Sequence, residues 1–200
     1  METVAKPDEE SSAHITKDSE IMKINETPDG HIASVVYRDA DGAEQTLVGD
    51  EFISSMSAKD LVDSMGDGNQ SAQPVPARMK QIVDGFPYRD FVTAGFLVDH
   101  LTLKSETNIQ DAHQERIKKA YLAYFDTWSQ IDDVVQWLDS FGNLYCVERN
   151  GQHRYNNMNY FMVVTAFEAV DNIKNGRADK KNVWNVNTEK EYHEERWLFV

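Results

Sequence analysis

Apolar and polar residues alternate along the first part of the chain in a pattern that predicts a small sheet. Three alternating runs lie between residues 20 and 56, and the last of them covers residues 45–56. Turn signals separate the runs, Pro-Asp-Gly at residues 28–30 and the pair Asp41-Gly42. Period-two alternation between such turns is typical of strands joined as hairpins. We therefore expect an antiparallel β-meander, preceded by a disordered polar tail over residues 1–19.

Helical periodicity and two further apolar runs follow the meander. Residues 88–103 are apolar nearly throughout and predict a central strand, and residues 143–147 predict a second buried strand. Ser57 and Asp60 have the spacing of a helix cap, and Gly176 is placed to end the last helix. Apolar residues that share one face predict helices at residues 55–66, 75–86, 129–141 and 157–176. The remaining residues, 177–200, are expected to form a polar C-terminal tail.

Composition narrows the classes of partner. The chain has 200 residues and a formal charge of −14, which opposes binding to the phosphates of a nucleic acid. No run of residues has the apolar length of a membrane span, and the first residues do not resemble a signal peptide. Cys146 is the single cysteine and lies in an apolar run, so a buried thiol is expected there. These features predict a cytoplasmic protein with no membrane or nucleic-acid partner, and no histidine spacing indicates a metal site.

A dense polar segment lies between the second buried strand and the last helix, at residues 148–159. A strand, a glycine-containing loop and a helix in this order are typical of ligand sites at the carboxyl edge of an α/β sheet. Arg149 and Arg154 have the chemistry to pair with phosphate oxygens, and Gly151 would let the backbone approach a ligand. The alternative is a hydrogen-bonded loop that braces the following helix.

This region also carries a resemblance to a known family. The stretch NLYCVERNGQHRYNNMNYFMVVTAFEAVDNI, residues 143–173, resembles the carboxyl-terminal flavin-binding segment of FAD-dependent oxidoreductases of the amine oxidase and protoporphyrinogen oxidase type, which are akin to UDP-galactopyranose mutases. Residues 50–62, 88–91 and 118–128 resemble further parts of the same family. The residues that match the family motif are Arg149, Asn150, Gly151, His153, Arg154, Tyr155, Asn156, Asn157 and Met158.

The resemblance implies an α/β fold, namely a partial Rossmann-like FAD-binding domain over residues 20–176 with the β-meander attached. It implies FAD as the cofactor. The implied cofactor-binding residues are Arg149, Asn150, Gly151, Arg154, Tyr155, Asn156, Asn157, Met158 and Asn159. It gives no candidate for a catalytic residue.

The chain also departs from the family pattern. Glu148 stands where the family usually has glycine, and the sequence contains no G-x-G-x-x-G fingerprint for the adenosine half of FAD. The similarity is also interrupted near residues 108–111, because the long substrate-domain insert that the family carries there is missing from this chain. These departures predict a shortened relative.

Two functions follow as expectations. The first is a FAD-dependent oxidoreductase family protein that retains the carboxyl-terminal flavin-binding segment. The alternative is a non-catalytic remnant or protein-interaction module without bound flavin. The expected partners are the flavin cofactor and either a second copy of the chain or a different chain that supplies the missing half.

Overall fold

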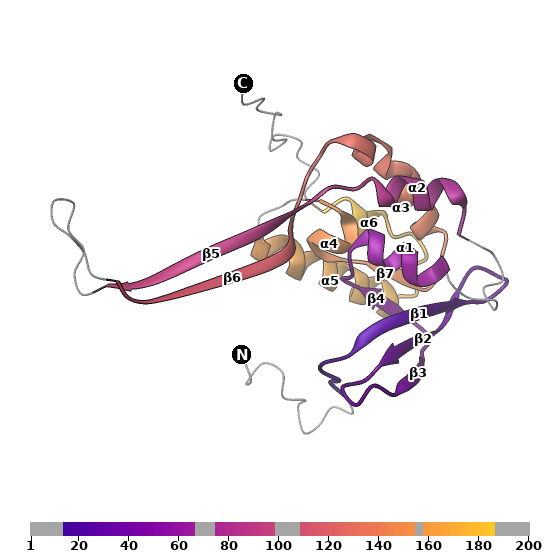
Figure 1. The fold of residues 1–200 in the computed structure, drawn as a ribbon. Coiled ribbons are helices and arrows are strands. Elements are labelled where there is room, and N and C mark those ends of the chain that lie inside the picture. Colours follow the sequence, from indigo (N-terminus) through magenta and orange to yellow (C-terminus); the bar gives the residue numbers. More distant parts are fainter. Residues whose placement is uncertain (1–13, 67–74, 99–108, 155–157, 187–200) are drawn as a thin grey trace.

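The computed structural model describes residues 14–66, 75–98, 109–154 and 158–186. In chain order the elements are β1 (Glu20–Glu26), β2 (Ile32–Arg38), β3 (Glu44–Val48), β4 (Phe52–Ser54), α1 (Ala58–Gly66), α2 (Ala77–Asp84), β5 (Tyr88–Val98), β6 (Ile109–Leu122), the 3-10 helix η1 (Asp126–Gln130), α3 (Ile131–Asp139), β7 (Leu144–Cys146), α4 (Glu148–Gln152), α5 (Met158–Lys174) and α6 (Lys181–Trp184). The helices gather around the short β4–β7 pair, the meander packs to one side, and β5 and β6 extend away as a ribbon (Figure 1). Helices and small sheets are thus mixed, which confirms an α/β fold in this broad sense.

The predicted meander is confirmed as an antiparallel sheet in the order β1-β2-β3. Ile24 pairs with Val35 in the first ladder, and Val35 pairs with Leu47 in the second. Gly42 has a φ of +83° in the turn between β2 and β3, a conformation that glycine adopts without steric penalty. The Asp41-Gly42 signal therefore identified the hairpin correctly.

Residues 45–56 form two strands and not the single strand that the alternation predicts. The first part is β3, and after Gly49 and Asp50 the chain leaves the meander to form β4. β4 pairs in parallel with β7, so that Phe52 lies beside Leu144 and Ser54 beside Cys146. Alternation along a strand shows which side chains share a face, but it does not show which neighbouring strand supplies the hydrogen bonds.

The side chain of Asn143 joins the meander to the parallel pair. Its Oδ1 accepts a hydrogen bond from the Ile32 N–H at 2.7 Å, and its Nδ2 donates to the Ile32 carbonyl at 2.9 Å and to the Asp50 carbonyl at 2.8 Å. Its own carbonyl accepts from the Phe52 N–H at 2.9 Å. Asn143 is buried, and its two side-chain bonds to Ile32 form away from competing water.

Helices α1, α2 and α3 supply most of the apolar core. Ser57 caps α1 as expected, because its Oγ accepts from the Asp60 N–H at 3.2 Å and donates to the Asp60 carboxylate at 2.6 Å. The predicted helical periodicity is confirmed by the positions that face inward. The largest fully buried side chains of these helices are Leu61, Val62, Met65, Ile82, Val83, Val134 and Leu138.

The expectation of a central strand at residues 88–103 is wrong. β5 pairs with β6 alone among the described strands, and its side chains from Arg89 to Leu97 are exposed on both faces. Phe96 and Leu97 keep 59% and 60% of their surface exposed. An apolar run indicates a strand whose side chains would be stabilised by burial, but the sequence does not show which element buries them.

The last helices close one side of the core. Gly176 has a φ of +60° just after α5, which confirms it as the residue that ends the helix. Residues 177–186 of the expected polar tail include α6, whose Val183 and Trp184 are buried. Lys180 is also buried, and its ammonium donates to the carbonyls of Phe141 and of Leu144. No helix in the described part of the chain is long and apolar enough to cross a bilayer.

We predict that Asn143→Ala lowers the free energy of unfolding by about 3 kcal/mol, because it removes the partner of two buried backbone groups of Ile32 and of the Asp50 carbonyl. Urea denaturation measures the change. Asn175→Ala is the matched control, since its amide donates to the Asp171 carbonyl on the exposed surface, and it should lower the same quantity by less than about 1 kcal/mol. Equal losses in the two variants would contradict the role given to Asn143.

Candidate functional site

The polar segment begins where the parallel strands end. β4 leads into α1 and β7 leads directly into α4, so both helices start at the carboxyl edge of the β4–β7 pair. The predicted loop is in its first part a short helix, Glu148–Gln152, which ends at His153 in the left-handed conformation with a φ of +47°. Carboxyl edges of parallel strands are the positions at which open α/β sheets bind ligands. The location therefore suits a site, although the local structure differs from the prediction.

Arg149 and Asn150 lie in α4 with half-buried side chains. The Oδ1 atom of Asn150 is buried and has no hydrogen-bond partner in the structure. A buried amide oxygen without a partner is an unfavourable arrangement that an N–H or O–H donor would relieve. Gln152 Oε1 and His153 Nε2 in the same segment are also buried without a partner. Of these three residues, Asn150 is the one among the expected cofactor-binding residues.

Gly151 approaches the protein's own backbone and not an open cradle. A Cβ atom built at Gly151 would lie 2.9 Å from the Ser54 carbonyl oxygen and 3.6 Å from that of Met56. The absence of a side chain lets α4 pack directly on the end of β4. The expected close approach is therefore real, but its partner is β4 and the residues that follow it.

Arg154 and Gln152 hold α4 against α6. The Arg154 Nη1 donates to the Trp184 carbonyl at 2.6 Å. The Gln152 Nε2 donates to the carbonyls of Cys146 at 3.1 Å and Val183 at 2.9 Å. The pKa of Arg154 is lowered by burial, while the charges of Asp132 and Tyr124 oppose that shift. Of the two arginines proposed for phosphate, Arg154 thus has an internal role in this structure.

Glu148 occupies a position whose backbone suits glycine. Its φ is +66°, in the left-handed region that raises the energy of residues with a Cβ atom. Its N–H donates to the Thr165 Oγ1 of α5 at 3.1 Å, and burial raises the pKa of its carboxyl group. The glycine usual in the resembling family would remove both the strain and the half-buried acid.

His153 is part of the core, although it belongs to the matched motif. Its ring stacks on Phe86 with centroids 4.3 Å apart, and its Nδ1 lies 3.3 Å from the Tyr88 hydroxyl. The side chain is fully buried, and burial lowers its pKa from 6.5 to about 4. His153 is therefore neutral near pH 7.

The other candidate positions give less information. Tyr155, Asn156 and Asn157 lie outside the described residues. Met158 and Asn159 form the start of α5. Cys146 is buried as expected, and burial raises the pKa of its thiol to about 12. In the part of the chain that the structure describes, no cluster of three or more His, Cys, Asp or Glu side chains is placed to hold a metal ion.

Sequence reasoning missed the buried polar residues that organise this region. Asn143, Gln152 and Lys180 bond to carbonyls that are between six and 111 positions away in the chain. A single buried polar residue has no periodic pattern around it, and its partners are not neighbours in sequence. The weak signal available was that Asn143 borders the apolar run of residues 144–147, and Gln152 and Lys180 have no such signal.

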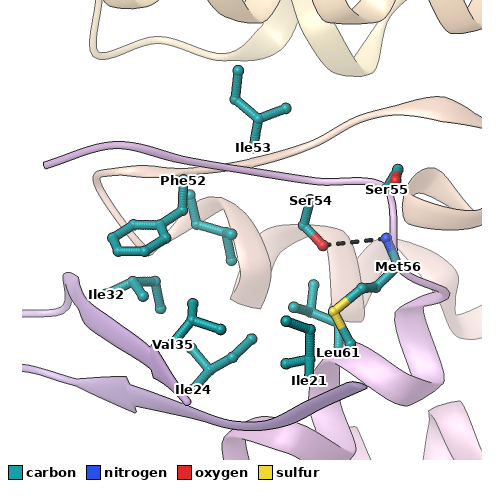
Figure 2. A pocket seen from close by; sticks show the side chains of 11 residues that line it. Ile21, Ile24, Ile32, Val35, Phe52, Ile53, Ser54, Ser55, Met56 and Leu61 are labelled. Atoms are coloured by element: carbon teal, nitrogen blue, oxygen red, sulfur yellow. Dashed lines mark hydrogen bonds between the residues drawn. The ribbon is translucent and has the colours of Figure 1, made fainter. Parts of the chain in front are cut away.

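An apolar cavity of about 220 Å³ lies beside β4, between the meander and α1. Ile24, Ile32, Val35, Phe52 and Leu61 are among its lining residues (Figure 2). Ile53 is also among the lining residues, although its side chain extends to the opposite side of β4 in the same view. None of the candidate cofactor residues lines this cavity, so it is separate from the polar segment.

Comparisons of the chain with protein-family models, with curated proteins and with solved structures found no match. The resemblance to flavoproteins therefore remains a prediction from the motif residues.

We predict that Gly151→Ala lowers the free energy of unfolding by about 2 kcal/mol, because the added methyl group meets the Ser54 carbonyl and α4 must move away. Chemical denaturation measures the loss. Gly49→Ala is the control, since its Cβ would lie at an ordinary 3.4 Å from the Phe52 ring and should change the same quantity by less than about 0.5 kcal/mol. A tolerated Gly151→Ala would show that α4 does not pack on β4.

The lowered pKa of His153 leads us to predict that the protein loses stability in mild acid. Its folded pKa of about 4 lies below the usual 6.5, so the unfolded chain takes up the proton first as the pH falls. Stability is therefore complete above pH 6.5 and declines between pH 6.5 and about 4. Between about pH 7.5 and about pH 4.5 the decline from this residue is about 2.5 kcal/mol.

The measurement is the pH dependence of the free energy of unfolding in the wild type and in His153→Asn, because asparagine tolerates the left-handed backbone. The wild type should lose about 2.5 kcal/mol more than the variant over this interval. Glu26 and Glu148, whose carboxyl pKa values burial raises, contribute with the opposite sign but equally in both proteins. Parallel pH profiles would show that folding does not lower the pKa of His153.

Proposed function

We propose that the chain is a relative of FAD-dependent oxidoreductases whose β4–β7 edge contacts part of a flavin dinucleotide. The observation that carries the proposal is Asn150, which resembles its counterpart in the flavin-binding motif and presents a buried Oδ1 without a partner at this edge. Arg149 adjoins it in α4 and would supply the positive charge for a phosphate. When bound, the flavin would supply the redox chemistry, and the chain would orient it.

The described residues fit such a cofactor only in part. Arg149 and Asn150 fit a phosphate and a hydroxyl donor, respectively. Gly151 and Arg154 do not, because they contact Ser54 and Trp184 of the protein itself. These 200 residues also contain no G-x-G-x-x-G fingerprint. The proposed site is therefore incomplete, and weak binding with no catalysis by these residues alone is the form of the proposal that agrees with the contacts.

A second candidate function is a non-catalytic α/β module. The observation that favours it is the internal use of the polar segment, since Arg154 and Gln152 donate to carbonyls around α6 and the Glu148 N–H donates to Thr165. In this alternative the motif is retained because it braces α4 against α5 and α6. Flavin binding distinguishes the two functions directly.

We predict that the purified chain quenches FAD fluorescence with a dissociation constant on the order of 10⁻⁵ M. Arg149→Ala should weaken binding at least tenfold, because a charge-assisted hydrogen bond contributes about 1.5–3 kcal/mol. ADP should compete and riboflavin should not, since only ADP carries the diphosphate. Glu148→Gly should tighten binding, because it removes a carboxylate and backbone strain at the same edge.

Arg177→Ala is the matched control, since Arg177 is an exposed residue that follows α5 and lies outside α4. It should bind FAD as the wild type does. The proposal fails if no FAD binds at concentrations up to about 1 mM, or if Arg149→Ala and Arg177→Ala have equal affinities. Either result would favour the non-catalytic module.

A further inference from the structure

The ribbon formed by β5 and β6 leaves a long apolar strand without a partner on its outer edge. Among the described residues, β6 is the strand that pairs with β5, and no other does. The ribbon stands clear of the helices over most of its length (Figure 1). Two-stranded ribbons are marginally stable in water, and a hydrophobic sheet generally needs three or more strands. The β5–β6 ribbon, called the arm below, therefore lacks the further strand that its apolar composition favours.

The two outer edges of the ribbon differ in charge. From Phe91 to Val98 the sequence of β5 is FVTAGFLV, without an ionisable group or proline. β6 carries Asp111, His113, Glu115, Arg116, Lys118 and Lys119. Natural proteins place charges on exposed edges to prevent pairing with other chains. β6 is protected in this way and β5 is not, which matters in a chain whose net charge of −14 otherwise opposes association.

The unprotected stretch of β5 is complementary to itself. In an antiparallel pair of two β5 strands related by a two-fold axis at Ala94, Val92 faces Phe96 of the second copy. In the same register Phe91 faces Leu97, Thr93 faces Gly95, and Ala94 faces its own copy. Apolar and aromatic residues directly opposite each other are the pairs that stabilise sheets. No charged residue faces another charged residue in this part of the register.

Exposed apolar side chains lie along the unprotected strand. Phe91, Val92, Phe96 and Leu97 of β5 keep between 41% and 60% of their surface exposed. Each of them faces another of the four in the register above. An interface limited to the two β5 edges is small, which favours a reversible dimer.

We propose that two copies of the chain pair through the outer edges of their β5 strands, in antiparallel register about Ala94, to form a four-stranded sheet. The new outer edges are then the two charged β6 strands, so the assembly closes at the dimer and does not extend. The proposal concerns the arm alone and does not rest on flavin binding.

Disulfide trapping tests the register. Opposed residues in an antiparallel pair have Cα atoms about 4.5–5.5 Å apart, within the range of a disulfide. Ala94→Cys should therefore give a covalent dimer under mild oxidation. Gln114→Cys is the matched control, because Gln114 is the β6 partner of Ala94 on the same rung, and it should stay monomeric on a denaturing gel. The native Cys146 is buried and does not interfere.

Sedimentation equilibrium tests the association without a covalent bond. The wild type should dimerise with a dissociation constant on the order of 10 µM. Ala94→Lys should weaken the dimer at least tenfold, and Gln114→Lys should leave it unchanged. The proposal is overturned if the wild type is monomeric at about 100 µM, if both cysteine variants cross-link equally, if Ala94→Lys leaves the dimer intact, or if the mass rises without limit with concentration. A monomer that binds another protein through β5 would also overturn it.

Discussion

Asn143 joins three backbone segments that are far apart in the chain. It bonds to both backbone groups of Ile32 in the meander, to the carbonyl of Asp50 before β4, and through its own carbonyl to the N–H of Phe52. These bonds fix where β4 lies relative to β7, and hence where the chain leaves both strands. The carboxyl edge that carries the candidate site exists only if this arrangement forms.

The polar segment at this edge makes several contacts within the protein. Gly151 lets α4 contact the end of β4, and Arg154 ties the following turn to α6. Beside these contacts, the Oδ1 atom of Asn150 in α4 is buried and has no partner in the structure. These internal contacts account for much of the polar segment without a ligand, and contact with a dinucleotide is what we propose in addition.

Local chemistry could be predicted from the sequence, and long-range contacts could not. The cap at Ser57, the hairpin at Gly42 and the helix end at Gly176 follow from residues a few positions apart. Asn143 could not be identified, because its partner Ile32 lies 111 positions away. The location of β5 was mistaken for a related reason. Its apolar pattern is that of a covered strand, but in the described chain only β6 lies beside it.

Native-state hydrogen exchange of the Ile32 and Phe52 amides tests this account most directly, since both amides donate to Asn143. If Asn143 unites the meander and the parallel pair, both amides exchange only through global unfolding. Their opening free energies then agree with each other and with the global value within about 0.5 kcal/mol. An Ile32 amide that opens several kcal/mol more easily than the Phe52 amide would show that the meander detaches on its own, and would contradict the account.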